Sequence, residues 1–161
     1  MKIGIISDTH LKYRDKQLEK IFENHFADAE MILHAGDLVC LDILDIFAGK
    51  EVYAVHGNMD SEEVIESLPT KRIINVRGHR IGLIHGWGDP FGMEDRIRGE
   101  FEDVACLVYG HTHHPVNEKK DGTLFFNPGS PTDRRFSPYN SIGILDVSET
   151  IEGHIIKLEK R

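Results

Sequence analysis

Short apolar runs alternate with segments of helical spacing in the first half of the chain, whereas short apolar strands dominate the second half. The first half predicts strands at 2–6, 31–34 and 52–55, helices at 15–26 and 41–47, and a helix that follows Ser61 and ends at Pro69. The second half predicts paired strands at 72–76 and 80–84, a helix at 93–101, strands at 105–109 and 123–126, and a final antiparallel pair at 141–147 and 151–158. This pattern indicates an α/β fold in which two sheets pack face to face with helices outside.

Composition narrows the class of protein. The chain has 161 residues, 40% of them hydrophobic and 29% charged, which is typical of one soluble globular domain. Its net charge of −8 weighs against dedicated binding of nucleic acid or of an anionic membrane. The charge does not exclude an anionic substrate, because bound divalent cations reverse the sign locally.

The cysteines and the N-terminus bear on the compartment. Cys40 and Cys106 match no metal-binding spacing, and two buried reduced thiols fit a reducing cytoplasm. The apolar run that follows Lys2 is too short for a signal peptide, and no run approaches the length of a transmembrane helix. We therefore expect a cytoplasmic protein.

Side chains with metal-binding atoms follow the predicted strands in five places. In chain order they are Asp8 and His10, Asp37, Asn58, His85, and finally His111 with His113. Carboxylate and amide oxygens mixed with imidazole nitrogens suit first-row divalent cations better than Ca²⁺ or a thiolate-bound Zn²⁺. One tetrahedral site takes about four ligands. Seven candidates therefore fit two cations that share a bridging carboxylate, a pair suited to displacement at phosphorus.

Other residues near these clusters have two interpretations each. Any one of the histidines, taken alone, is more often a core or surface residue than a ligand, and we assign His34 and His56 to the core or to the support of ligands. The segment 127–130 is a turn with a structural or a substrate-binding role. Arg134 and Arg135 are either phosphate contacts or a solvated pair.

The ordered motifs resemble those of the calcineurin-like metallophosphoesterase superfamily, and in particular its small YfcE-type phosphodiesterases. The resemblance rests on D-x-H at 8–10, G-D at 36–37, G-N at 57–58, the histidine at 85 and G-H-x-H at 110–113. It implies that residues 1–161 form a single metallophosphoesterase domain, a four-layer αββα sandwich of two mixed sheets flanked by helices. It also implies two divalent cations, with Mn²⁺ expected first and Ni²⁺, Zn²⁺, Fe²⁺ or Mg²⁺ as alternatives.

The resemblance also implies a ligand set and a mechanism. One cation would be held by Asp8, His10, Asp37 and His113, and the other by Asp37, Asn58, His85 and His111, with Asp37 bridging. A metal-bound hydroxide would attack phosphorus in a phosphodiester, which makes the chain a phosphoric diester hydrolase.

One position departs from the family pattern. Many members carry a histidine after the G-N asparagine that is thought to protonate the leaving group, and here the residue is Met59. We count Asp37, Asn58 and Asp60 as catalytic residues, and we expect Asp60 to orient a ligand histidine. A thioether delivers no proton, so we expect either a preference for small diesters with good leaving groups, such as aryl or nucleoside-type diesters, or a water molecule that acts as the acid.

Three further possibilities stay open at the level of sequence. The same site would also serve a phosphomonoesterase or a nuclease. A non-catalytic protein-binding scaffold, like the related subunit of the retromer sorting complex, requires eroded ligands, which this chain does not show. A homodimer is compatible with the apolar stretches of the second half.

Overall fold

The computed structural model describes residues 1–133 and 135–159. The helices are α1 (Lys16–Ile21), which continues as a π-helical turn (Phe22–Phe26), a 3₁₀ helix (Leu41–Phe47), α2 (Glu62–Ser67) and α3 (Met93–Arg98). The strands are β1 (Lys2–Ile6), β2 (Met31–His34), β3 (Glu51–Ala54), β4 (Lys71–Val76), β5 (His79–Ile84), β6 (Cys106–Val108), β7 (Val116–Lys120), β8 (Thr123–Asn127), β9 (Ser141–Val147) and β10 (Ile151–Lys157).

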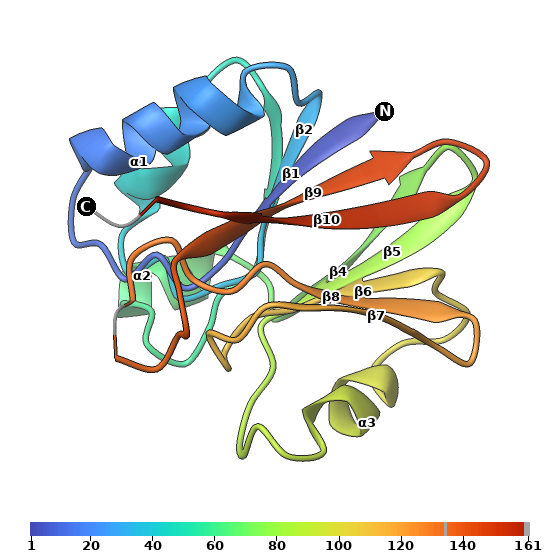
Figure 1. The fold of residues 1–161 in the computed structure, drawn as a ribbon. Helices are drawn as coiled ribbons and strands as arrows, with labels where there is room; N and C mark the ends of the chain where they lie inside the picture. Colours follow the sequence, from blue (N-terminus) through green and yellow to red (C-terminus); the bar gives the residue numbers. More distant parts are fainter. Residues whose placement is uncertain (134, 160–161) are drawn as a thin grey trace.

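The ten strands form two mixed sheets, ordered β10-β9-β1-β2-β3 and β4-β5-β6-β8-β7 (Figure 1). In the first sheet, β1, β2 and β3 run parallel, and Ile6 pairs with His34, which pairs with Ala54. In the second sheet, β5, β6 and β8 run parallel. Parallel strands in register end at the same edge, so the loops that follow them meet there.

Three apolar clusters separate four layers. The central cluster takes alternate residues from both sheets, such as Ile3 and Ile5 of β1 facing Leu124 and Phe126 of β8. A second cluster joins the other face of the first sheet to α1 and α2. A third joins the second sheet to α3 through Ile97. Because a strand points successive side chains to opposite faces, each sheet packs on the other sheet with one face and on helices with the opposite face. The result is the αββα sandwich expected from the sequence (Figure 1).

The helix boundaries follow local capping. The Asp15 side chain accepts hydrogen bonds from the backbone N–H groups of Gln17 and Leu18, at 2.7 and 3.2 Å, and so starts α1. Ser61 caps α2 in the same way through Val64. The strand β7 was not expected, because its sequence VNEKK has no apolar alternation. No helix in the part of the chain that the structure describes is long and apolar enough to cross a membrane.

Candidate metal centre

All seven predicted ligands come together at the shared edge of the two sheets. Asp8 and His10 follow β1, Asp37 follows β2, and Asn58 follows β3. The other three, His85, His111 and His113, follow β5 and β6. Five of the seven have a backbone φ between +48° and +68°, namely Asp8, His10, Asp37, His111 and His113. Left-handed backbone is rare in residues other than glycine and costs energy, and it concentrates at functional sites.

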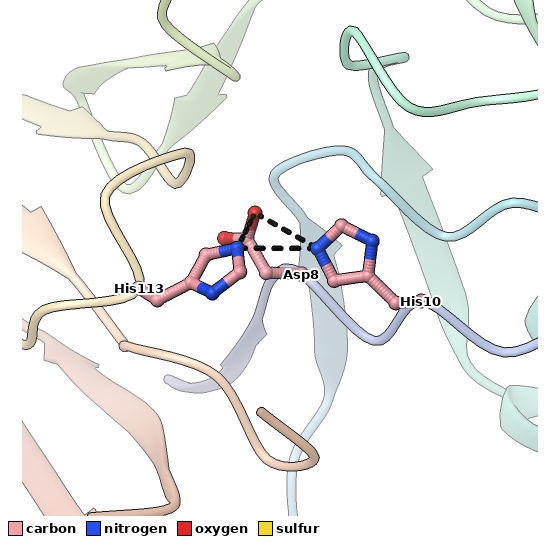
Figure 2. Close-up of side chains that lie close together, drawn as sticks. All are labelled: Asp8, His10 and His113. Atoms are coloured by element: carbon pink, nitrogen blue, oxygen red, sulfur yellow. Dashed lines mark hydrogen bonds and ion pairs between the residues drawn. The ribbon is translucent and has the colours of Figure 1, made fainter. Parts of the chain in front are cut away.

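The two oxygens of the buried Asp8 carboxylate have different surroundings. Its Oδ2 accepts hydrogen bonds from the Ser7 hydroxyl at 2.6 Å and from the His111 backbone N–H at 3.1 Å. Its Oδ1 is buried and has no hydrogen-bond partner among the described residues. This orphaned oxygen lies 3.2 Å from His113 Nε2 and 3.8 Å from His10 Nε2 (Figure 2). The three side chains together form a group with the spacing of metal ligands.

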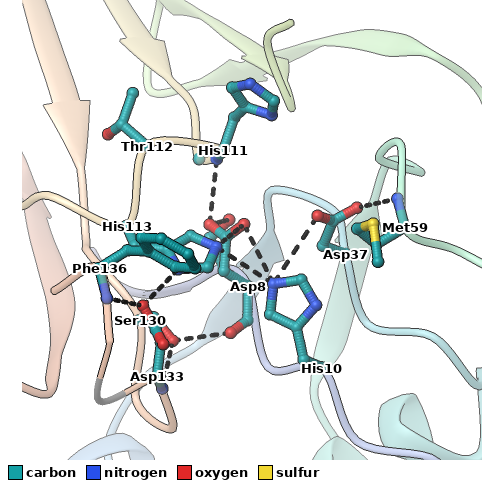
Figure 3. Close-up of polar contacts among 12 residues, drawn as sticks. Asp8, His10, Asp37, Met59, His111, Thr112, His113, Ser130, Asp133 and Phe136 are labelled. Carbon is teal, nitrogen blue, oxygen red and sulfur yellow. Dashed lines mark hydrogen bonds and ion pairs between the residues drawn. The ribbon is translucent and has the colours of Figure 1, made fainter. Parts of the chain in front are cut away.

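His113 is oriented by a carboxylate that the sequence did not reveal. Its Nδ1 lies 2.7 Å from Asp133 Oδ2, so Nδ1 carries a hydrogen and Nε2 faces Asp8 (Figure 3). Burial lowers the pKa of His113, but the nearby carboxylates of Asp8 and Asp133 outweigh burial and raise the pKa to about 9. Burial raises the pKa of Asp133, but His113 and two backbone N–H groups outweigh it and lower the pKa to about 2.

A second group of potential ligand atoms lies around Asn58 Oδ1. His85 Nδ1 lies 2.7 Å from the Ala35 carbonyl, which only accepts, so His85 Nε2 is unprotonated when the ring is neutral. His111 Nε2 lies 2.9 Å from the Gly88 carbonyl, which leaves His111 Nδ1 unprotonated by the same reasoning. These two nitrogens lie 3.2 and 2.9 Å from Asn58 Oδ1. Three unshared electron pairs that point at one another repel, unless a cation or protons lie between them.

Asp37 stands between the two groups. Its Oδ1 accepts a hydrogen bond from the Met59 backbone N–H at 2.8 Å. Its Oδ2 lies 3.3 Å from His85 Nε2 and 3.7 Å from His10 Nε2. Burial raises the pKa of Asp37, but the hydrogen bond and charge of His85 outweigh burial and hold the pKa below its ordinary range. An ionised carboxylate that faces one histidine of each group has the placement of a bridging ligand.

The donor set therefore fits divalent cations. Asp8 Oδ1 is a buried oxygen without a hydrogen-bond partner among the described residues. Asp133 orients the His113 ring toward this oxygen, and the Ala35 carbonyl orients the His85 ring toward Asn58 Oδ1, as neighbouring groups commonly orient metal-binding histidines. Hard oxygens mixed with imidazoles suit first-row divalent ions.

Asp60 has a different role from the one expected. Its buried carboxylate accepts three backbone hydrogen bonds, from Asp37 at 3.0 Å, Gly57 at 2.7 Å and Val39 at 2.5 Å. The expectation that Asp60 orients a ligand histidine is therefore wrong. The carboxylate instead holds the backbone of the Asp37 loop, in which Asp37 and Val39 have φ values of +55° and +77°. Sequence reasoning missed this role because backbone donors leave no side-chain signature.

Arg96 fixes the loop that orients His111. Its guanidinium donates hydrogen bonds to three backbone carbonyls within 87–91. Gly88 lies in that loop with φ of +79°, and its carbonyl holds His111 Nε2. The contact joins α3 to the metal centre without a direct approach to any ligand atom.

The turn at 127–130 also supports the centre. Asn127 donates to the Gly110 carbonyl at 2.9 Å, next to His111, and the Ser130 hydroxyl donates to the Asp8 carbonyl at 2.8 Å. These contacts give the turn a structural role in positioning the ligand loops.

The remaining histidines lie outside the two groups. His34 Nδ1 accepts from the Gly36 N–H at 3.2 Å, and its Nε2 lies 3.2 Å from the Thr9 hydroxyl. Burial lowers the pKa of His34 to about 4, so it is a neutral core residue that supports the Asp37 loop. His56 lies 3.3 Å from the Thr70 hydroxyl, and His114 is exposed.

A cavity of about 900 Å³ opens over the cluster. Besides predicted ligands, its lining includes Leu11, Lys12, Val39, Met59, Pro90, Arg135 and Phe136. The Met59 side chain is 60% exposed at the position where the family pattern has a histidine. Arg135 lies in the lining, as a phosphate contact would, whereas Arg134 is outside the described residues.

Comparison with known proteins agrees with this geometry. Residues 1–150 match the calcineurin-like phosphoesterase superfamily domain. A probable metallophosphoesterase of Methanocaldococcus jannaschii is 38% identical, in an alignment that covers 99% of this chain and 83% of the relative. A phosphodiesterase of the same organism is 32% identical, over 92% of this chain and 95% of the relative. The structure of vacuolar protein sorting 29 from Cryptosporidium parvum matches with a TM-score of 0.73 and 25% identity, over 99% of this chain and 98% of that chain. The chain therefore belongs to the calcineurin-like phosphoesterase superfamily.

Proposed function

We propose that this protein is a metal-dependent phosphodiesterase with a dinuclear centre. One observation carries the proposal: two groups of inward-facing nitrogen and oxygen atoms, around Asp8 Oδ1 and Asn58 Oδ1, lie on either side of Asp37 Oδ2. Asp8, His10, Asp37 and His113 would hold one cation, and Asp37, Asn58, His85 and His111 would hold the other. Bound divalent cations would supply a Lewis acid for the phosphoryl oxygens and lower the pKa of a water molecule.

The chain itself supplies orientation and shape. The Ala35 carbonyl and Asp133 hold the rings of His85 and His113, so little reorganisation is needed when a cation binds. The cavity places Lys12 and Arg135 in its lining, and these cations favour an anionic ester in a chain of net charge −8. Mn²⁺ is the cation that we propose first, with Ni²⁺, Zn²⁺, Fe²⁺ and Mg²⁺ as alternatives.

The side chain of Met59 sets the expected leaving group. It lines the cavity beside Asp37 and Asn58, and its thioether has no proton to give. Esters whose leaving group needs no protonation, such as p-nitrophenyl esters, should therefore react far faster than dialkyl esters. Equal rates for the two kinds of ester would show that another group donates the proton.

Two other functions remain candidates on specific grounds. A phosphomonoesterase or nuclease would use the same ligands, and a substrate panel separates it from a diesterase. A protein-binding scaffold stays an alternative, since the chain is also similar in structure to vacuolar protein sorting 29, but the presence of all seven candidate ligands favours an enzyme. The cytoplasmic location and the homodimer stay predictions.

Hydrolysis by metal-stripped protein tests the proposal. Mn²⁺, Ni²⁺, Zn²⁺ or Mg²⁺ is added back, and turnover of bis-p-nitrophenyl phosphate is compared with that of p-nitrophenyl phosphate. We expect metal-dependent turnover that is faster on the diester. Asp37→Asn should abolish it and keep the fold, whereas the exposed Asp42→Asn serves as the matched control. Metal uptake without turnover on either ester would favour the scaffold.

A further inference from the structure

An exposed aromatic ring is fixed beside the metal centre. Phe136 is 63% exposed, yet its backbone N–H donates to Asp133 Oδ2 at 2.9 Å, the same oxygen that orients His113. Its ring centroid lies 6.2 Å from that of His113, with the rings at 70° to one another. The backbone of Phe136 is therefore tied to the centre and its ring lies against His113, although most of the residue is exposed.

The surroundings of this ring are those of a ligand pocket. Phe136 lines the 900 Å³ cavity together with the apolar side chains of Leu11, Val39 and Pro90. The Arg135 guanidinium lies 5.5 Å from the centroid of the Phe136 ring. Concave, largely apolar surface with a few polar groups is typical of small-molecule sites, and an exposed apolar patch there is commonly covered by a ligand.

Phe136 and Met59 lie at opposite ends of the cluster. Figure 3 shows Phe136 beside His113, Met59 beside Asp37, and Asp8 between them. Because the family acid stands at the Met59 position, the proposed reaction puts the leaving group on that side, and a group that contacts Phe136 would then belong to the part of the diester that stays on phosphorus.

We propose that Phe136 forms a subsite for a planar aromatic group, an aryl ring or a nucleobase, on the retained ester of the substrate. The inference rests on the proposed phosphodiesterase function and narrows its substrate class. A planar group stacks on an aromatic ring with little entropic cost, and the adjacent guanidinium can pack against the same group. A small alkyl ester would leave the ring and the apolar wall in contact with water.

Binding of two phosphonates tests the subsite without hydrolysis. Phenylphosphonate and methylphosphonate carry the same anionic group on a stable C–P bond and differ only in the planar ring. Their dissociation constants for the Mn²⁺-loaded protein are measured by calorimetry. We expect phenylphosphonate to bind more tightly to the wild type, and Phe136→Ala to reduce that preference about tenfold, the factor that one stacking contact contributes. Phe136→Trp should retain the preference.

The matched control is Phe91→Ala. Phe91 is 91% exposed and is absent from the cavity lining, so its removal should keep the preference. A preference that is unchanged in Phe136→Ala, or lost equally in Phe91→Ala, overturns the subsite. A parallel assay with bis-p-nitrophenyl phosphate separates the two proposals. Retained phosphonate preference without turnover supports binding of a planar group at Phe136 but contradicts the phosphodiesterase and the retained-ester assignment with it. Turnover without the preference supports the phosphodiesterase and overturns the subsite.

Discussion

Replacement of Asp60 by asparagine is the sharpest test of how the centre is supported. The carboxylate accepts hydrogen bonds from the backbone N–H groups of Asp37, Gly57 and Val39. Asparagine keeps the shape but has only one accepting oxygen, so at least one of these donors loses its partner. The loop it holds contains two residues of left-handed backbone, which stay in that conformation only while contacts enforce it.

The size of the effect follows from these contacts. An unsatisfied buried donor costs about 1–3 kcal/mol, and two bonds that lose a charged acceptor weaken by about 1 kcal/mol each. We therefore expect Asp60→Asn to lower the free energy of unfolding by about 3–5 kcal/mol. For a chain of this size, that corresponds to a fall in Tm of roughly 10 °C. Because the Asp37 backbone moves, Mn²⁺ affinity should also fall by about tenfold or more.

Urea unfolding of the metal-free protein measures the first effect, and calorimetric titration with Mn²⁺ measures the second. Asp42→Asn removes the same charge from the surface and serves as the control. A midpoint for Asp60→Asn equal to that of the control would refute the supporting role. Lost affinity with unchanged stability would instead show that Asp60 acts on the metal centre without stabilising the fold.

Two other predictions concern the supports of His111 and His113. Arg96→Lys should weaken Mn²⁺ binding several-fold, because an ammonium cannot hold three loop carbonyls as the guanidinium does, and calorimetry that shows unchanged affinity would contradict this. Asp133→Asn should lower the pKa of His113 from about 9 in the metal-free protein, and an NMR titration that shows the same pKa would contradict it. The raised pKa of His113 stabilises the folded wild type fully below pH 6.5, and this stabilisation is lost as the pH rises through about 9. The variant should therefore be less stable than the wild type at low pH, and the difference in stability should shrink over this interval.

The candidate ligands could be located from sequence because each group of them follows a predicted strand. Apolar runs such as 2–6 and 31–34 locate the strand ends, and parallel strands in register bring Asp8 and Asp37 to one edge. The ordered motifs then identify the family and, with it, the four-layer arrangement.

The supports could not be predicted in the same way. Asp133 lies 20 residues from His113, and no local pattern marks it as a partner of that ring. The hydrogen bonds of Asp60 are all to backbone groups, and the strand β7 is a polar edge strand whose pairing with β8 shows only in three dimensions. These features depend on loop geometry, which hydrophobic periodicity does not encode.

The most direct test of the central claim is anomalous diffraction from a crystal of the protein loaded with Mn²⁺. The account predicts two manganese peaks at the edge of the sheets, one beside Asp8, His10 and His113 and the other beside Asn58, His85 and His111, with Asp37 between them. Absence of manganese from this cluster under saturating Mn²⁺, or a single peak remote from Asp37, would contradict the dinuclear centre.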